Sequence, residues 1–365
     1  MAIYRIYPSK DTSLYSKYID ASAGSDEVLE IDSYFAQSDT YVTRSVLAFD
    51  HSKTVDVITN LTGGTYQANL KMYLAFAQEV PTEYTIEAAP LYDNWIEGTG
   101  KIGDNPPNRT GASWEGAGNG QWSAANPSLH TTSSYLDDGI GGATWYTEIS
   151  GSSTLHTQTN GTTSTHDIDI DVTTSIEAMV AGSIPNNGFI VKLEDALEFQ
   201  TDRVLMLKYF SSQSHTIYPP VLEIKWDDSE WNPSQSISVV NTSDITVSLK
   251  GNKGRYNEEG KQRFRINCRP KFPARTYSTT SIYTQNHYLP QGTMWGIKDE
   301  YTESMVVDFD SNYTKISADA NGNYFDVYMD SLATERYYRL LLKSEIDGST
   351  VVVDNDIVFK VVRNG

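Results

Sequence analysis

Residues 41–49 have the sequence YVTRSVLAF, in which β-branched and aromatic residues alternate with polar ones. This alternation is typical of a strand that buries one face. The same kind of pattern recurs in four further stretches bounded by Gly, Asn, Asp or Pro: residues 65–75, 188–193, 204–209 and 221–226. The sequence therefore predicts an all-β fold.

One short helix is expected among these strands, at residues 173–181. Ile176, Met179 and Val180 have the i, i+3, i+4 spacing of a helix face. Asp171 or Thr173 can accept hydrogen bonds from the free N–H groups of the first turn. Residues 185–188 (PNNG) then end the helix.

The composition limits the class of protein. With 365 residues the chain has room for roughly one to three domains, and 39% apolar with 21% charged residues is typical of a folded protein. The single cysteine, Cys268, excludes a disulfide framework and is expected to be a buried thiol. The sequence has no apolar run of membrane-helix length and no apolar leader after Met1, so we expect synthesis in a host cytoplasm, no export and no membrane partner.

Charge divides the chain in two. The net charge is −19, but residues 1–231 carry 12 basic and 31 acidic side chains, whereas residues 232–365 carry 16 of each. We therefore expect two independently folding domains, residues 1–230 and 235–365, joined at residues 226–234 (WDDSEWNPS). An acidic surface repels the nucleic-acid backbone, so no nucleic-acid partner is expected.

A Gly-, Ser- and Thr-rich stretch at about residues 100–165 interrupts the first domain. It lacks the periodicity of a strand or a helix but contains Trp114, Trp122 and Trp145, so we expect it to lie against its own domain or a neighbour. Three interpretations of these tryptophans and of the 24 tyrosines stay open: a protein interface, rings that stack on sugars, or core packing.

The second domain is expected to be an immunoglobulin-like β-sandwich. Short strands separated by turn-forming residues are typical of that fold. A tyrosine within residues 336–340 (RYYRL) can supply its corner tyrosine. The strand patterns lie at residues 245–249, 263–268, 324–329, 337–343 and 357–362.

A run of nine basic residues opens this domain and is opposed only by Glu258 and Glu259. It is either the solvated face of a strand or a docking patch for an acidic protein surface, with nucleic acid as a third interpretation. In a docking patch, charge steers association and aromatic rings hold the complex. The run consists of Lys250, Lys253, Arg255, Lys261, Arg263, Arg265, Arg269, Lys271 and Arg275. The candidate docking residues are Lys253, Arg255, Tyr256, Lys261, Arg263, Phe264, Arg265 and Phe272.

Three carboxylates occupy alternate positions in residues 166–173 (HDIDIDVT). In a strand, Asp167, Asp169 and Asp171 share one face, while Ile168 and Ile170 face the core. The acids either bind a structural Ca²⁺ or are hydrogen-bonded and solvated, with Asp171 capping the helix that follows. No other cofactor is expected.

No motif predicts catalysis, and we expect a protein without enzymatic activity. The six histidines form no HExxH pattern, no nucleophile elbow is present, and the glycine-rich stretches lack the Lys-Ser/Thr pair of a phosphate loop. Trp95 and Glu97 are the natural choice for a glycoside-hydrolysing site. The alternative is a core tryptophan that stands beside an exposed acid.

In chain order, short motifs of the first domain resemble the DNRLRE module. The resemblance spans about residues 7–226 apart from the inserted stretch, and it implies a jelly-roll β-sandwich similar to carbohydrate-binding modules, in which a structural calcium is common. The second domain resembles immunoglobulin-like domains of tailed-phage virion proteins. The motifs are at residues 11–14 (DTSL), 28–31 (VLEI), 44–50 (RSVLAFD), 68–74 (ANLKMYL), 95–97 (WIE), 169–173 (DIDVT), 186–189 (NNGF), 210–212 (FSS) and 219–224 (PPVLEI).

These resemblances imply a structural accessory component of a bacteriophage virion. It is expected to decorate the capsid or to belong to the neck or tail, in many copies of a symmetric assembly, with other virion proteins as its partners. One alternative is a glycan-binding adhesin that recognises a host surface glycan. The other is a polysaccharide depolymerase.

Overall fold

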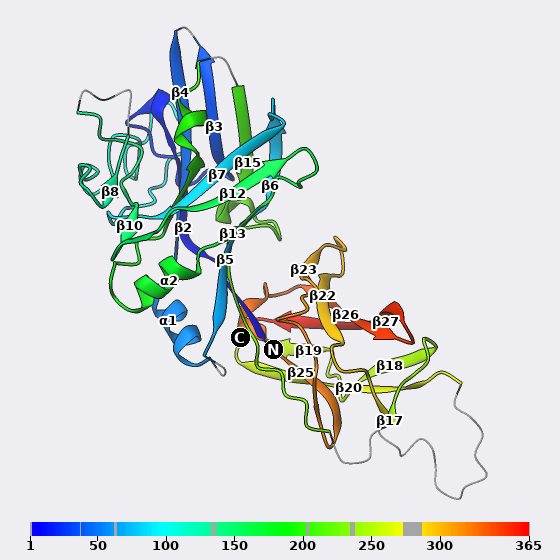
Figure 1. The fold of residues 1–365 in the computed structure, drawn as a ribbon. Coiled ribbons are helices and arrows are strands. Elements are labelled where there is room, and N and C mark those ends of the chain that lie inside the picture. Colours follow the sequence, from blue (N-terminus) through cyan, green and yellow to red (C-terminus); the bar gives the residue numbers. More distant parts are fainter. Residues whose placement is uncertain are drawn as a thin grey trace, which may run out of the picture. The chain divides into compact units, whose positions relative to one another are not determined.

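The computed structural model describes residues 2–36, 38–61, 64–132, 136, 138–201, 204–233, 238–272 and 287–364. Strands and turns make up nearly all of it, which confirms the predicted all-β fold of two β-sandwiches (Figure 1). The chain divides into two compact units. The N-terminal unit comprises Ile6–Asn60 and Gln67–Glu223, and the C-terminal unit comprises Met1–Arg5, Leu61–Tyr66 and Ile224–Gly365.

The N-terminal unit is built on an eight-stranded sheet with the order β12-β7-β14-β4-β3-β15-β6, in which β2 also pairs with β4. A second sheet of four strands has the order β1-β16-β5-β13, and the division between the units falls within β1, β5 and β16. The eight strands are β2 (Pro8–Tyr15), β3 (Val28–Ala36), β4 (Asp39–Phe49), β6 (Leu74–Gln78), β7 (Glu83–Pro90), β12 (His156–Gly161), β14 (Phe189–Leu193) and β15 (Val204–Phe210). The four are β1 (Ala2–Ile6), β5 (Tyr66–Met72), β13 (Ile168–Asp171) and β16 (Val221–Trp226).

Tyr73 divides the strand that the sequence predicts at residues 65–75. Before it, β5 belongs to the four-stranded sheet, and after it β6 belongs to the eight-stranded sheet. The chain therefore changes sheets within one apolar run, and a pattern of alternation cannot reveal such a crossing.

Helices are few in the described residues. The predicted helix is confirmed as α2 (Thr173–Val180), with Ile176 and Met179 buried. The sequence analysis did not find α1 (His51–Thr59), whose first turn is capped because the Asp50 side chain accepts a hydrogen bond from the Lys53 N–H at 2.8 Å. The remaining short helices are α3 (Asp195–Glu198) and the 3-10 turns η1 (Ser16–Tyr18), η2 (Ser212–Ser214) and η4 (Met329–Ser331).

The inserted stretch packs on its own unit. Trp114, Trp122 and Trp145 are 0%, 2% and 1% exposed, and they share one core cluster with Val42 and Val46 of β4. The expectation that these rings stack on sugars is therefore wrong. Before β12 (His156–Gly161), which pairs with β7, the described part of the stretch has only short pairings, so its large rings supply much of the apolar area that anchors it. These pairings involve β8 (Leu129–His130), β9 (Trp145–Tyr146), β10 (Glu148–Ile149) and β11 (Ser152–Ser153).

The C-terminal unit is a second sandwich. One sheet has the order β17-β21-β20-β25-β24, with β18 also paired to β20, and the other has the order β19-β27-β26-β22-β23. The first comprises β17 (Ser238–Val239), β18 (Ile245–Lys250), β20 (Lys261–Pro270), β21 (His287–Tyr288), β24 (Ser317–Asp319) and β25 (Gly322–Tyr328). The second comprises β19 (Arg255–Asn257), β22 (Met294–Asp299), β23 (Met305–Val307), β26 (Tyr337–Ile346) and β27 (Ser349–Val362).

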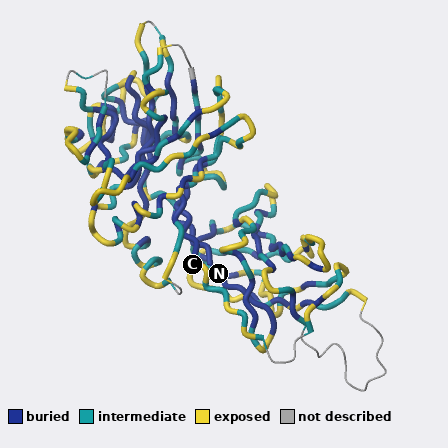
Figure 2. The backbone as a smooth tube through the Cα atoms, in the orientation of Figure 1, coloured by how far each residue is buried: buried dark blue, intermediate teal, exposed yellow. Residues whose placement is uncertain are grey.

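Alternation along β20 places Phe264, Ile266 and Cys268 in the core between these sheets. Burial raises the pKa of the Cys268 thiol to about 12, as expected for a small apolar side chain. Tyr338 is the corner tyrosine, because its hydroxyl donates a hydrogen bond to the Ala333 carbonyl at 2.8 Å. Figure 2 shows the buried backbone following the strands of each unit, with exposed segments at the turns.

Part of the predicted joint at residues 226–234 is hydrogen-bonded to β24 of the C-terminal unit. The Asn232 N–H donates to the Ala318 carbonyl at 2.8 Å, and the Ala318 N–H donates to the Glu230 carbonyl at 2.8 Å. At the other end of the chain, Ile3 is buried in the core of the same unit. Independent folding of the two expected domains stays a prediction.

Candidate functional site

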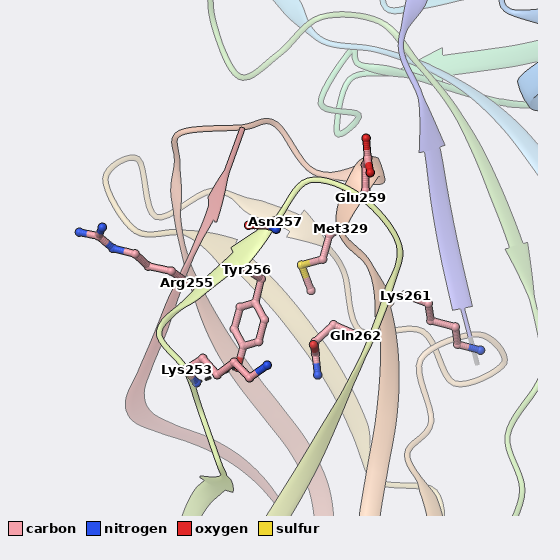
Figure 3. Close-up of a pocket in the computed structure, with 8 residues that line it drawn as sticks. All are labelled: Lys253, Arg255, Tyr256, Asn257, Glu259, Lys261, Gln262 and Met329. Atoms are coloured by element: carbon pink, nitrogen blue, oxygen red, sulfur yellow. Dashed lines mark hydrogen bonds between the residues drawn. The ribbon is translucent and has the colours of Figure 1, made fainter. Parts of the chain in front are cut away.

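A pocket of the C-terminal unit collects half of the predicted docking residues (Figure 3). This β19 pocket has a volume of about 380 Å³ and lies between β19, the start of β20 and η4. It is lined by Lys253, Arg255, Tyr256, Asn257, Glu259, Lys261, Gln262 and Met329.

Tyr256 forms the inner wall of the β19 pocket. Its ring is 7% exposed and packs edge-on against Phe264 at 5.2 Å and Phe359 at 6.0 Å between centroids. Its hydroxyl accepts a hydrogen bond from the Lys253 N–H at 3.1 Å and donates one to Asn252 Oδ1 at 3.0 Å. The expectation that Tyr256 and Phe264 hold a partner through exposed rings is wrong, because strand alternation turns both into the core.

Acids of β24 and β25 neutralise three of the nine residues of the predicted basic run. Arg263 forms a two-pronged pair with Asp326 at 2.9 and 3.0 Å, and Arg265 forms one with Asp319 at 2.9 and 2.7 Å. Lys261 lies 3.1 Å from Asp326. These hydrogen bonds raise the pKa of both guanidinium groups. This part of the run is therefore a strand face with paired charges.

Among the cations that line the pocket, Lys253 and Arg255 differ from Lys261. Both are exposed, and no carboxylate of the described residues lies within 4.0 Å of either side-chain charge. Figure 3 shows Arg255 and Lys261 extending away from Tyr256 on opposite sides of the pocket. The pocket therefore presents two unpaired positive charges beside the carboxylate of Glu259.

Phe272 is separated from this pocket by the whole of β20. It is 75% exposed and follows the far end of the strand, whereas Lys261 begins it. The eight candidates therefore form no single patch. Arg275, the last member of the basic run, lies outside the described residues.

The N-terminal unit contains a second pocket that the sequence analysis missed, called the tyrosine pocket below. It has a volume of about 490 Å³, and its lining includes Tyr15, Tyr18, Tyr34, Tyr41, Glu30 and Asp32. One row of directly paired residues crosses four strands beneath it: Tyr15 with Thr43, Thr43 with Asp32, and Asp32 with Met206. Extending the strand pattern of residues 28–31 to residue 36 would have placed Glu30, Asp32 and Tyr34 on one face.

Asp32 is the most deeply placed charged group of the tyrosine pocket. It is 3% exposed, and its Oδ1 atom has no hydrogen-bond partner among the described residues. Burial raises the pKa of Asp32 to about 7, and the neighbouring Glu30 carboxylate adds to this rise. Hydrogen bonding by Thr43 and the charge of Lys208 oppose it. Lys208 itself pairs with Glu30 at 2.6 Å.

Two of the three alternating acids lie as predicted, because Asp169 and Asp171 are outward on β13 while Ile168 and Ile170 are buried. Asp167 directly precedes the strand. Each carboxylate has donors from the protein: Leu74 N–H for Asp167, Asn69 for Asp169, and Thr173 for Asp171. Within the described ranges, no three carboxylate, imidazole or thiolate side chains gather as metal ligands would. Calcium binding by these acids stays a prediction.

Trp95 and Glu97 belong to the packing of the N-terminal unit. Trp95 is 2% exposed and its indole N–H donates to the Asn187 carbonyl at 3.0 Å. Glu97 accepts a hydrogen bond from the Asp11 N–H at 2.9 Å, and burial raises the pKa of Asp11 to about 6. The arrangement joins β2 to the chain that follows β7.

No helix in the described part of the chain is both long and apolar enough to span a membrane. No protein-family model matches the sequence, and no curated protein is similar to it. Among solved structures, the chain is similar to a DUF4785 family protein from Legionella pneumophila, with 7% identity and a TM-score of 0.15. The match covers 99% of this chain and 62% of that protein, so the chain spans less than two thirds of its length. A TM-score of 0.15 carries no inference about fold or function.

Proposed function

We propose that this protein is a structural, non-enzymatic accessory component of a tailed-phage virion, which docks through the β19 pocket of its C-terminal unit. The proposal rests on the resemblance of its two domains to a DNRLRE-like jelly roll and to immunoglobulin-like domains of virion proteins. Head decoration and a place at the neck or tail are equally compatible with it.

One observation favours the β19 pocket as the docking end: the two unpaired cations, Lys253 and Arg255, at the rim of a concave surface. All of the net charge of −19 comes from residues 1–231, so copies repel one another through their first domain. An acidic surface on another virion protein is the partner that fits two exposed cations. Charge then steers association, while the buried contact area sets the lifetime of the complex.

The test uses purified particles that lack the protein and the full-length recombinant chain. The double variant Lys253→Glu, Arg255→Glu is expected to bind these particles at least about tenfold more slowly at low salt, because two attractive charges become repulsive. The wild type is expected to lose association rate with added salt more than it gains dissociation rate.

Lys271→Glu is the control, since it makes one such charge reversal just beyond the far end of β20, outside the pocket. It is expected to bind as the wild type does. Weak binding by Lys271→Glu together with normal binding by the double variant would move the docking surface to the Phe272 end. No binding of wild-type protein to particles would contradict the virion role.

A further inference from the structure

We propose that the outer edge of β19 binds an extended acidic segment of the partner protein as an additional strand of the sheet. This inference rests on the docking role proposed above and adds to it the conformation and the side-chain chemistry of the segment that docks. It starts from the place of β19 at the end of its sheet, where β27 is its neighbour on one side.

The backbone of β19 has hydrogen-bonding groups on its other side. β19 runs parallel to β27, and the Glu258 N–H directly after it donates to the Val362 carbonyl at 2.9 Å. Because alternate residues of a strand direct their backbone groups to opposite sides, the N–H and C=O groups of Arg255 and Asn257 point away from β27. No strand of the described residues pairs with them there. Such an edge is a template for a further strand.

Side-chain alternation along β19 determines what the added strand meets. Arg255 and Asn257 are exposed, whereas Tyr256 between them is buried and lines the β19 pocket. The side chains of a paired strand alternate in the same way, so one faces Arg255 and the next enters the pocket. There it meets the hydrogen-bond donors of Lys261 and Gln262, which line the pocket too. Side chains that accept hydrogen bonds fit both positions.

Charge favours an acidic segment. The Arg255 guanidinium has no carboxylate within 4.0 Å among the described residues, and Figure 3 shows the Glu259 carboxylate extending in a different direction. An acid directly across from Arg255 forms an attractive cross-strand pair, whereas a basic residue there is repelled. A second copy of this chain is a less suitable source of the segment, because its net charge of −19 repels another copy.

The turn before β19 holds this edge in place before any partner arrives. The Tyr256 hydroxyl accepts from the Lys253 N–H at 3.1 Å and donates to Asn252 Oδ1 at 3.0 Å. The same Asn252 oxygen accepts from the Gly254 N–H at 2.9 Å. Because the edge is already ordered, binding loses little conformational entropy on this side of the interface.

The test measures dissociation of the full-length chain from purified particles that lack the protein. Asn257→Pro removes one outward N–H, and an edge strand accepts proline at such a position. Asn257→Ala is the matched control, because it removes the same side chain and keeps the N–H. Asn257→Pro is expected to dissociate about tenfold faster than Asn257→Ala, since a lost backbone hydrogen bond acts mainly on dissociation. Thermal melting of both variants checks that the fold is retained.

Hydrogen exchange of the wild type gives a second measurement that needs no substitution. Exchange at residues 255–257 is expected to slow when the chain binds to particles. Either equal dissociation of the two variants or unchanged exchange at these residues would overturn the added strand, while salt-dependent binding would leave the docking role intact. Absence of wild-type binding would contradict the docking role itself. Self-association of the free wild type that Asn257→Pro abolishes would make a second copy the occupant and overturn the assignment to another protein.

Discussion

Arg44 and Glu198 form a two-pronged ion pair in which neither side chain reaches solvent. The distances are 2.9 Å from Nε to Oε1 and 2.8 Å from Nη2 to Oε2. The guanidinium carbon of Arg44 also lies 4.8 Å and 5.2 Å from the ring centroids of Trp114 and Trp145. The ion pair therefore links the central strand β4, the turn α3 and the inserted stretch.

Removing one charge of this pair should destabilise the N-terminal unit strongly. Glu198→Gln leaves the Arg44 charge buried without its full counter-charge, and a loss of about 3 kcal/mol in the free energy of unfolding is expected. Chemical denaturation followed by tryptophan fluorescence measures it. The control is Glu27→Gln, because Glu27 pairs with Lys101 at 3.7 Å on the surface, where a change below about 1 kcal/mol is expected. Equal losses in both variants would contradict this assignment.

Asp32 should make the stability depend on pH. The pKa of its carboxyl is raised from 3.8 to about 7 by burial, so between these values the folded protein holds a proton that the unfolded chain releases. The free energy of unfolding therefore falls as the pH rises from about 4 to about 7, by up to about 1.4 kcal/mol per pH unit. The side chain introduced by Asp32→Asn cannot ionise. The difference between the melting temperatures of the variant and the wild type is therefore expected to shift in favour of the variant as the pH rises from about 4 to about 7. A difference that is constant from pH 4 to pH 8 would exclude this effect.

Ile3 should stabilise the C-terminal unit although it lies at the start of the chain. It is 6% exposed within the core cluster that contains Val240 and Phe264. Ile3→Ala is expected to cost about 2–4 kcal/mol. Hydrogen exchange with peptide resolution should then become faster in β20 and β25 of the full-length chain. Faster exchange confined to β3 and β4 of the N-terminal unit would contradict a role of Ile3 in the C-terminal core.

The corner hydroxyl of Tyr338 should contribute about 1 kcal/mol, because it is buried and bonded to the Ala333 carbonyl. Tyr338→Phe removes that bond and leaves the ring in place. Urea denaturation is expected to show the loss, whereas the exposed Tyr301→Phe should have no effect. If Tyr338→Phe leaves the free energy of unfolding unchanged, packing of the ring alone stabilises this corner.

The sequence predicted strands well where the whole predicted segment belongs to a single sheet, as at β4, β14 and β18. It failed where burial is decided by distant parts of the chain. The three tryptophans of the inserted stretch look exposed in a polar segment, and only the packing of that segment on β4 buries them. α1 was missed because its cap, Asp50, directly follows a strand pattern.

The candidate sites were predicted less well than the fold. Lys253 and Arg255 were found, but the carboxylates that neutralise Arg263 and Arg265 come from Asp326 and Asp319, more than fifty residues away. The tyrosine pocket brings together β2, β3, β4 and β15, and its key row exists only once their register is known. Spacing along one strand cannot supply that information.

The assignment of Met1–Arg5 to the C-terminal unit has a consequence for synthesis of the protein. A ribosome synthesises a chain from its N-terminus, so Met1–Arg5 leaves the ribosome before Ile224–Gly365, the main part of the same unit, has been translated. Apart from the short Leu61–Tyr66 segment, everything translated in between belongs to the other unit. The N-terminal unit can therefore complete its fold while the nascent chain is still attached, and Met1–Arg5, although translated before that unit, is among the last segments to reach its final neighbours.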